Sequence, residues 1–125
     1  MERLKAKRNE TATAKVHLQL KQGYHVNSNQ PADEYLIPLR LTWSAEPLKT
    51  EGIVYPKPAL EKYAFSEKPL SVYTSDFDVV TKFKVPANAT SGPAMATGKL
   101  RYQACNDRMC LPPKTIDITM TIEIQ

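Results

Sequence analysis

The sequence has little of what marks several common functional classes. No run approaches the roughly 20 apolar residues of a membrane-spanning helix, and no apolar signal-peptide core follows Met1. The net charge is only +4, and half of it comes from the first ten residues. The remaining chain has no cluster of Lys and Arg interleaved with aromatic residues, which nucleic-acid binding usually requires. We therefore expect no nucleic-acid partner and no membrane span within these residues.

Glycine is also scarce, with four residues against ten prolines. Proline at this level favours edge strands and rigid loops over long helices. The 125 residues are 42% hydrophobic and 24% charged, which is typical of a folded globular protein, and this length suits a single domain with its own core. We expect a flexible basic lead-in over residues 1–12 and one domain, predicted to be monomeric, over residues 13–125.

No segment has a sustained helical period, whereas several alternate between apolar and polar residues, as half-buried strands do. About seven short strands separated by turn signals predict an all-β, antiparallel sandwich. Residues 23–34 are rich in turn formers and residues 44–70 form a long irregular stretch, so His25 is predicted in a turn and His17 on a solvent-facing strand position. The expected strands are Ala14–Lys21, Ile37–Trp43, Ile53–Tyr55, Ser71–Tyr73, Phe77–Val85, Ala94–Cys105 and Ile116–Ile124.

The two cysteines, Cys105 and Cys110, are separated by four residues between two strands that run in opposite directions. Facing non-hydrogen-bonded residues of such a hairpin have Cα atoms about 4.5 Å apart, within the range that a disulfide bridges. Alternation along the strand predicts that Cys105 faces away from Leu100 and Ala104. A disulfide across the hairpin tip is thus geometrically plausible.

The residues alone leave the purpose of this bond open. It closes a loop of only six residues, for which chain entropy gives about 2 kcal/mol, a small gain for a structural staple. Arg108 lies between the cysteines and would favour a thiolate, so thiol exchange and a local structural bridge are both consistent with the pattern. A zinc site would need a second pair of ligands, and His17 and His25 are distant in sequence, so we expect no metal.

The hairpin segment is Tyr102-Gln103-Ala104-Cys105-Asn106-Asp107-Arg108-Met109-Cys110-Leu111-Pro112-Pro113, and an earlier segment, 23–29, is Gly-Tyr-His-Val-Asn-Ser-Asn. The hairpin segment resembles the active-site hairpin of the N-terminal periplasmic domain of the thiol:disulfide interchange protein DsbD family. The early segment is also similar to that family, and the likeness covers most of the chain.

This resemblance implies an immunoglobulin-like sandwich that relays electron pairs by thiol–disulfide exchange in the periplasm, without a cofactor. Cys110 would form the mixed disulfide and Cys105 would resolve it, with Tyr102, Arg108 and Pro112 as supporting residues. The implied partners are thioredoxin-like: a reductant domain of the same membrane protein, disulfide isomerases and cytochrome c maturation thioredoxins. The chain would then be part of, or act next to, a membrane protein.

Members of the family also have a cap loop that covers the cysteines with an aromatic ring. The matching stretch is 62–68, where Phe65 is the first candidate for the cap and Tyr63 the second. The insert between the cysteines is one residue shorter than in the best-known members, and acidic residues near the cap are matched only by Glu61 or Glu67. The alternative function is a non-catalytic β-sandwich module that binds protein and has a structural hairpin disulfide.

Overall fold

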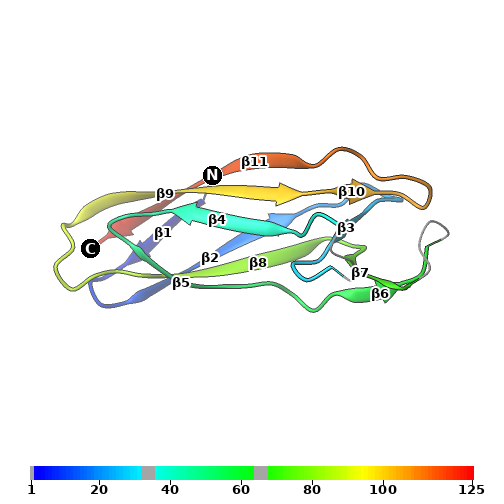
Figure 1. Ribbon diagram of the computed structural model, residues 1–125. Coiled ribbons are helices and arrows are strands. Elements are labelled where there is room, and N and C mark those ends of the chain that lie inside the picture. Colours follow the sequence, from blue (N-terminus) through cyan, green and yellow to red (C-terminus); the bar gives the residue numbers. More distant parts are fainter. Residues whose placement is uncertain (1, 32–35, 64–67) are drawn as a thin grey trace.

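A computed structural model of the chain describes residues 2–31, 36–63 and 68–125. These residues form eleven strands and no helix (Figure 1), so within the described ranges no helix exists that might cross a membrane. The strands are β1 (Glu2–Ala6), β2 (Thr11–Leu18), β3 (His25–Asn27), β4 (Arg40–Ser44), β5 (Lys49–Val54), β6 (Ala59–Glu61), β7 (Leu70–Tyr73), β8 (Phe77–Lys84), β9 (Gly92–Tyr102), β10 (Ala104–Cys105) and β11 (Lys114–Ile124).

Two sheets make up the body of the domain, one in the order β1-β11-β9-β4 and the other in the order β2-β8-β5. All of their pairings are antiparallel except that of β1 with β11, which is parallel. Trp43 of β4 joins the two layers: its ring meets Phe83 of β8 edge to face at 5.2 Å, and its indole N–H donates to Thr81 Oγ1 at 2.9 Å. This arrangement confirms the predicted all-β, immunoglobulin-like sandwich.

The core follows from the period-two pattern of the long strands, because alternate side chains point to opposite faces of a sheet. In β8, the alternate residues Phe77, Val79, Thr81 and Phe83 are buried. β11 shows the same pattern with a gradient, since Ile116 is 40% exposed whereas Ile122 is fully buried. The alternation predicted the inward face of both strands correctly.

A third, smaller sheet in the order β10-β3-β7-β6 lies at one end of the molecule (Figure 1). After β9 the chain passes into this sheet through a break at Gln103. β9 pairs with β11 and β4, whereas β10 pairs with β3. Leu70 and Val72 of β7 are buried here, outside the hydrophobic cluster of the main core. We call this sheet the distal sheet; it carries Cys105.

The first strand corrects the expected lead-in over residues 1–12. β1 pairs with β11 from Glu2↔Met120 to Ala6↔Ile124, and β2 already begins at Thr11. Leu4 packs against the core and Ala6 is buried, whereas Arg3 and Lys5 point to solvent. The inward-facing apolar residues are too few to give a clear sequence signal, and the pairing partner lies more than a hundred residues away.

Three strand assignments also change in the segments expected to be irregular. His25, predicted in a turn, belongs to β3 and is buried, because β3 is inserted between β10 and β7. The stretch 44–70 contains all of β5 and all of β6, and the second expected strand begins at Arg40 rather than Ile37. These strands have only three to six residues, too short for periodicity to show them.

Candidate redox site at the hairpin tip

Cys105 and Cys110 form a disulfide with an S–S distance of 2.06 Å and a Cα–Cα distance of 3.9 Å. They face each other as a non-hydrogen-bonded pair of an antiparallel bridge. The bonds on either side run from the Leu111 N–H to the Ala104 carbonyl, at 2.8 Å, and from the Asn106 N–H to the Met109 carbonyl, at 2.9 Å. The predicted hairpin and its bridged pair are therefore present.

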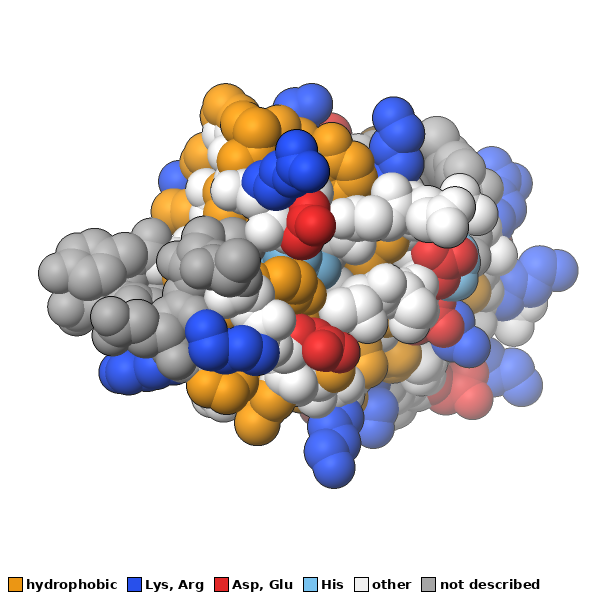
Figure 2. Space-filling model, turned by 90° about the vertical axis from the view of Figure 1, so that its right-hand side faces the viewer, with side chains coloured by type: hydrophobic (Ala, Val, Ile, Leu, Met, Phe, Trp, Pro, Cys, Tyr) orange, Lys and Arg blue, Asp and Glu red, His pale blue; other side chains and the backbone are white. Residues whose placement is uncertain are grey.

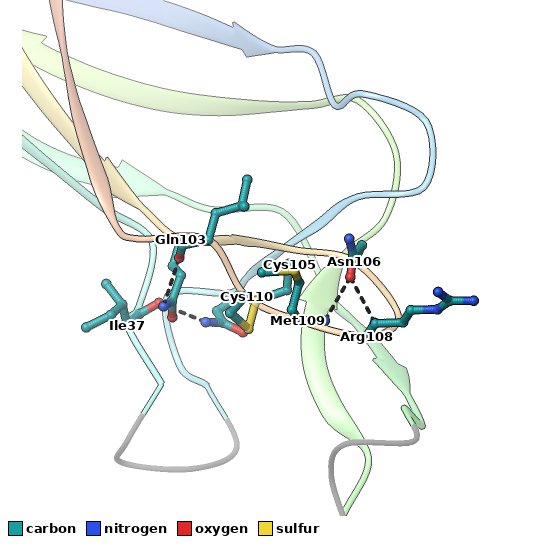
Figure 3. The surroundings of a disulfide bond; sticks show 9 residues. Ile37, Gln103, Cys105, Asn106, Arg108, Met109 and Cys110 are labelled. Atoms are coloured by element: carbon teal, nitrogen blue, oxygen red, sulfur yellow. Dashed lines mark hydrogen bonds between the residues drawn. A yellow bond between two sulfur atoms is a disulfide. The ribbon is translucent and has the colours of Figure 1, made fainter.

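The tip of the hairpin is held by the side chain of Asn106 (Figure 3). Its Oδ1 accepts the backbone N–H of Arg108 at 2.9 Å and that of Met109 at 2.8 Å. Asn favours such turns because its side chain hydrogen-bonds the backbone two or three residues on. The Arg108 side chain is exposed and extends away from the sulfur atoms, so in this conformation Arg108 contributes its main chain to the tip.

The two cysteines differ in exposure. Cys105 is 1% exposed, whereas Cys110 is half-buried. Sequence alternation predicted that Cys105 would face away from Leu100, Tyr102 and Ala104. Those three residues line one pocket beside the main core, whereas Cys105 is buried outside that core cluster, in the distal sheet. The outer sulfur therefore belongs to Cys110 and the inner one to Cys105.

Two of the three expected supporting residues, Tyr102 and Pro112, lie with Gln103 on the sandwich side of the disulfide. Gln103 donates from Nε2 to the Leu111 carbonyl at 3.3 Å and so ties the two arms of the hairpin together (Figure 3). Tyr102 is half-buried and lines an apolar pocket of about 320 Å³ that Leu111 also borders. Pro112 is exposed between the hairpin and β11, where its missing N–H would interrupt a strand ladder.

His25 is the residue at this site that the sequence analysis missed. It is 3% exposed, and the sheet register pairs it with Cys105. Its ring stacks on Tyr63, with centroids 4.2 Å apart and planes inclined by 16°. No local pattern marks His25, because β3 has only three residues and all of them are buried, so the strand shows no alternation.

Burial and one carboxylate set the electrostatics around His25. Desolvation lowers the pKa of His25, and the negative charge of Glu61, at the end of β6, opposes that shift. Desolvation and the same carboxylate both raise the pKa of Tyr63. At neutral pH the imidazole is therefore biased toward its neutral form and the phenol stays protonated.

Of the two expected cap residues, Tyr63 is described and lies over His25. Phe65 and Glu67 lie outside the described residues. Among the residues that the structure does describe, no three side chains of His, Cys, Asp or Glu converge as a metal site would require.

Fold and site together define a class of protein: a β-sandwich domain that presents a cystine across a hairpin tip. The family described as thiol:disulfide interchange protein DsbD, N-terminal, matches residues 2–122, and the chain belongs to that family. No individual curated protein matches the chain. The match confirms the resemblance found in the hairpin, and it associates the domain with thiol–disulfide exchange, thioredoxin-like partners in general and an extracytoplasmic location.

Proposed function

We propose that this domain relays electron pairs through the Cys105–Cys110 pair, from a membrane reductase to periplasmic thioredoxin-like proteins. The observation that carries the proposal is the unequal exposure of a disulfide at a hairpin tip. An incoming thiolate must reach a sulfur along the S–S axis, and the half-buried Cys110 is the more accessible of the two residues, since Cys105 is 1% exposed. Cys110 therefore forms the mixed disulfide and Cys105 resolves it.

The electron pair enters by two exchange steps. A partner thiolate attacks the Cys110 sulfur, a new S–S bond joins the two proteins, and the Cys105 sulfur leaves with the electron pair and takes up a proton. The second thiol of the partner then attacks its own sulfur in the mixed disulfide and releases Cys110 as a thiolate. The domain is now a dithiol and the partner a disulfide, and the reverse sequence reduces the next protein.

The surface around the tip suits contact with another protein. Figure 2 views this end of the molecule, where apolar side chains are exposed among acidic and basic ones. Met109, next to Cys110, is 57% exposed, and Leu60 on the edge strand β6 of the distal sheet is 71% exposed. Methionine adapts its shape to different partners, as a relay that meets both a donor and an acceptor requires.

Trapping with a thioredoxin-like probe tests the roles of the two sulfurs. Cys105→Ala leaves Cys110 as the free thiol and should form a stable mixed disulfide with a thioredoxin that lacks its own resolving cysteine, activated as a mixed disulfide with thionitrobenzoate. The matched variant Cys110→Ala should trap the same probe much more slowly, because Cys105 is buried. Equal trapping by both variants, or faster trapping through Cys105, would contradict the assignment.

The reduction potential separates this function from an inert structural bond. Equilibration of the domain with a dithiothreitol or glutathione series should give a value near that of thioredoxin-type carriers, about −270 mV. A potential well below about −300 mV is typical of structural disulfides. Such a value would indicate that the domain is a binding module with a fixed hairpin tip.

A further inference from the structure

The sheet register places an ionisable side chain beside the inner sulfur. Cys105 of β10 and His25 of β3 are directly opposite in an antiparallel pair. Side chains of such residues lie on the same face of the sheet, with Cβ atoms about 4.5–5.5 Å apart. Both side chains are buried, at 1% and 3% exposure, so the imidazole and the Cys105 sulfur are enclosed on the same face of the distal sheet.

Three segments at the end of the molecule that carries the distal sheet contribute groups around His25. Cys105 borders it from β10, Tyr63 stacks on its ring from the segment after β6, and the Glu61 carboxylate acts on it electrostatically from the end of β6. On the β7 side, Val26 pairs with Tyr73, whose hydroxyl donates to the Pro56 carbonyl at 2.7 Å. Among the described residues, Glu61 is thus the charge that acts on His25, and it is negative.

We propose that His25 is the proton acceptor for the Cys105 thiol when Cys105 resolves a mixed disulfide. The inference rests on the proposed exchange function. In the resolving step the Cys105 S–H bond breaks and its proton passes to the imidazole. The Cys105 sulfur bonds to that of Cys110, the bond from Cys110 to the partner breaks, and the partner's sulfur leaves as a thiolate with the electron pair.

Burial makes such an acceptor necessary. A thiolate is the nucleophile in disulfide exchange, and an apolar, enclosed position disfavours it. Desolvation keeps His25 neutral and able to accept a proton, because it lowers the pKa of the imidazole. Once the proton has moved, the Glu61 carboxylate stabilises the imidazolium, and Tyr63 separates the pair from solvent.

Two-phase reaction of the reduced domain with 5,5′-dithiobis(2-nitrobenzoate) isolates this step. Attack by Cys110 releases the first thionitrobenzoate, and resolution by Cys105 releases the second. His25→Phe keeps a ring against Tyr63 but has no proton to exchange, and His25→Gln keeps a polar side chain. Both variants should slow the second phase at pH 7 by at least about tenfold, within the range known for general acid–base catalysis, and leave the first phase within about twofold.

The pH profile distinguishes proton transfer from packing. In the parent domain the second-phase rate should rise through the titration of His25 and then level off. In both His25 variants the rate should instead keep rising until Cys105 itself ionises. The exposed histidine provides a control: His17→Gln, on β2, should change neither phase.

Three outcomes are decisive. A second phase that keeps its rate and its pH profile in both His25 variants overturns the inference. If His25→Phe does not fold, the titration of Cys105 is followed by its thiolate absorbance at 240 nm in Cys110→Ser, with and without His25→Gln. This comparison measures the coupling between Cys105 and His25 directly, and a Cys105 titration unchanged by His25→Gln refutes the inference. The absence of a first phase in the parent domain would instead contradict the proposed exchange function, so the two failures are distinguishable.

Discussion

Reduction of the Cys105–Cys110 bond should weaken the fold by a small and calculable amount. The bond closes a loop of six residues, and the chain-entropy relation for such a loop gives about 2 kcal/mol at 25 °C. The hairpin does not depend on the bond alone, because two backbone hydrogen bonds flank the pair and Asn106 holds the tip. We therefore expect the dithiol form to stay folded, with a free energy of unfolding about 2 kcal/mol lower than that of the disulfide form.

The same free energy enters the redox equilibrium. By a thermodynamic cycle, the free energy by which the disulfide stabilises the folded state equals the free energy by which folding stabilises the disulfide relative to the dithiol. For a two-electron couple 1.4 kcal/mol corresponds to about 30 mV, so about 2 kcal/mol lowers the reduction potential of the pair by only about 40 mV relative to the unfolded chain. Because the loop is short, biological dithiols can still reduce this disulfide, whereas a disulfide that stabilised the fold strongly would resist them.

Urea unfolding with and without excess dithiothreitol measures the difference directly. The midpoint should fall on reduction while the slope m stays nearly constant, because the fold and its buried surface are the same. The double variant Cys105→Ala with Cys110→Ala should show no dependence on dithiothreitol. A loss above about 4 kcal/mol, or unfolding on reduction, would refute the reasoning and identify the bond as a structural staple.

Three further predictions concern single side chains. Because His25 is neutral when folded and takes up a proton on unfolding, acid should destabilise the parent as pH falls below about 6.5, and His25→Phe should remove that part of the loss in urea titrations from pH 8 to pH 5. Asn106→Ala should cost about 1 kcal/mol in the same assay, because two backbone N–H groups lose their acceptor. Gly98→Ala should cost about 1–3 kcal/mol and change the fluorescence of Trp43, since its Cβ would lie 2.9 Å from that ring.

Matched variants define what would contradict these results. Asp107→Ala, exposed at the same tip, should be nearly neutral, and a similar loss there would remove the argument for Asn106. As the control for Gly98→Ala, Gly52→Ala should be tolerated, because no atom lies within 4 Å of the Cβ that it adds. Parallel stability curves for the parent and His25→Phe across the whole pH range would show that the imidazole is not perturbed by its burial.

The sequence predicted those parts of the fold that repeat over many residues or concentrate chemistry in a short motif. β8 and β11 show long alternation of apolar and polar residues, and the hairpin motif predicted the position of both cysteines and the family. It missed β1 and β3 because their pairing partners are distant in the chain and the strands are short. The burial of Cys105 and the position of His25 depend on the pairing of β10 with β3 in the distal sheet, which no local pattern encodes.

The separation of the distal sheet from the body of the sandwich has a consequence for how the molecule opens. Leu70, Val72 and Cys105 are buried outside the main core cluster, and in the part of the chain that the structure describes the distal sheet shares no strand pairing with the two larger sheets, although Val26 and Tyr73 pack into that core. Such a unit can open locally at a lower free energy than global unfolding. Amide hydrogens of β3 and β7 should then exchange with deuterium ahead of those in β8 and β9, so the domain can expose its inner sulfur while the sandwich remains closed.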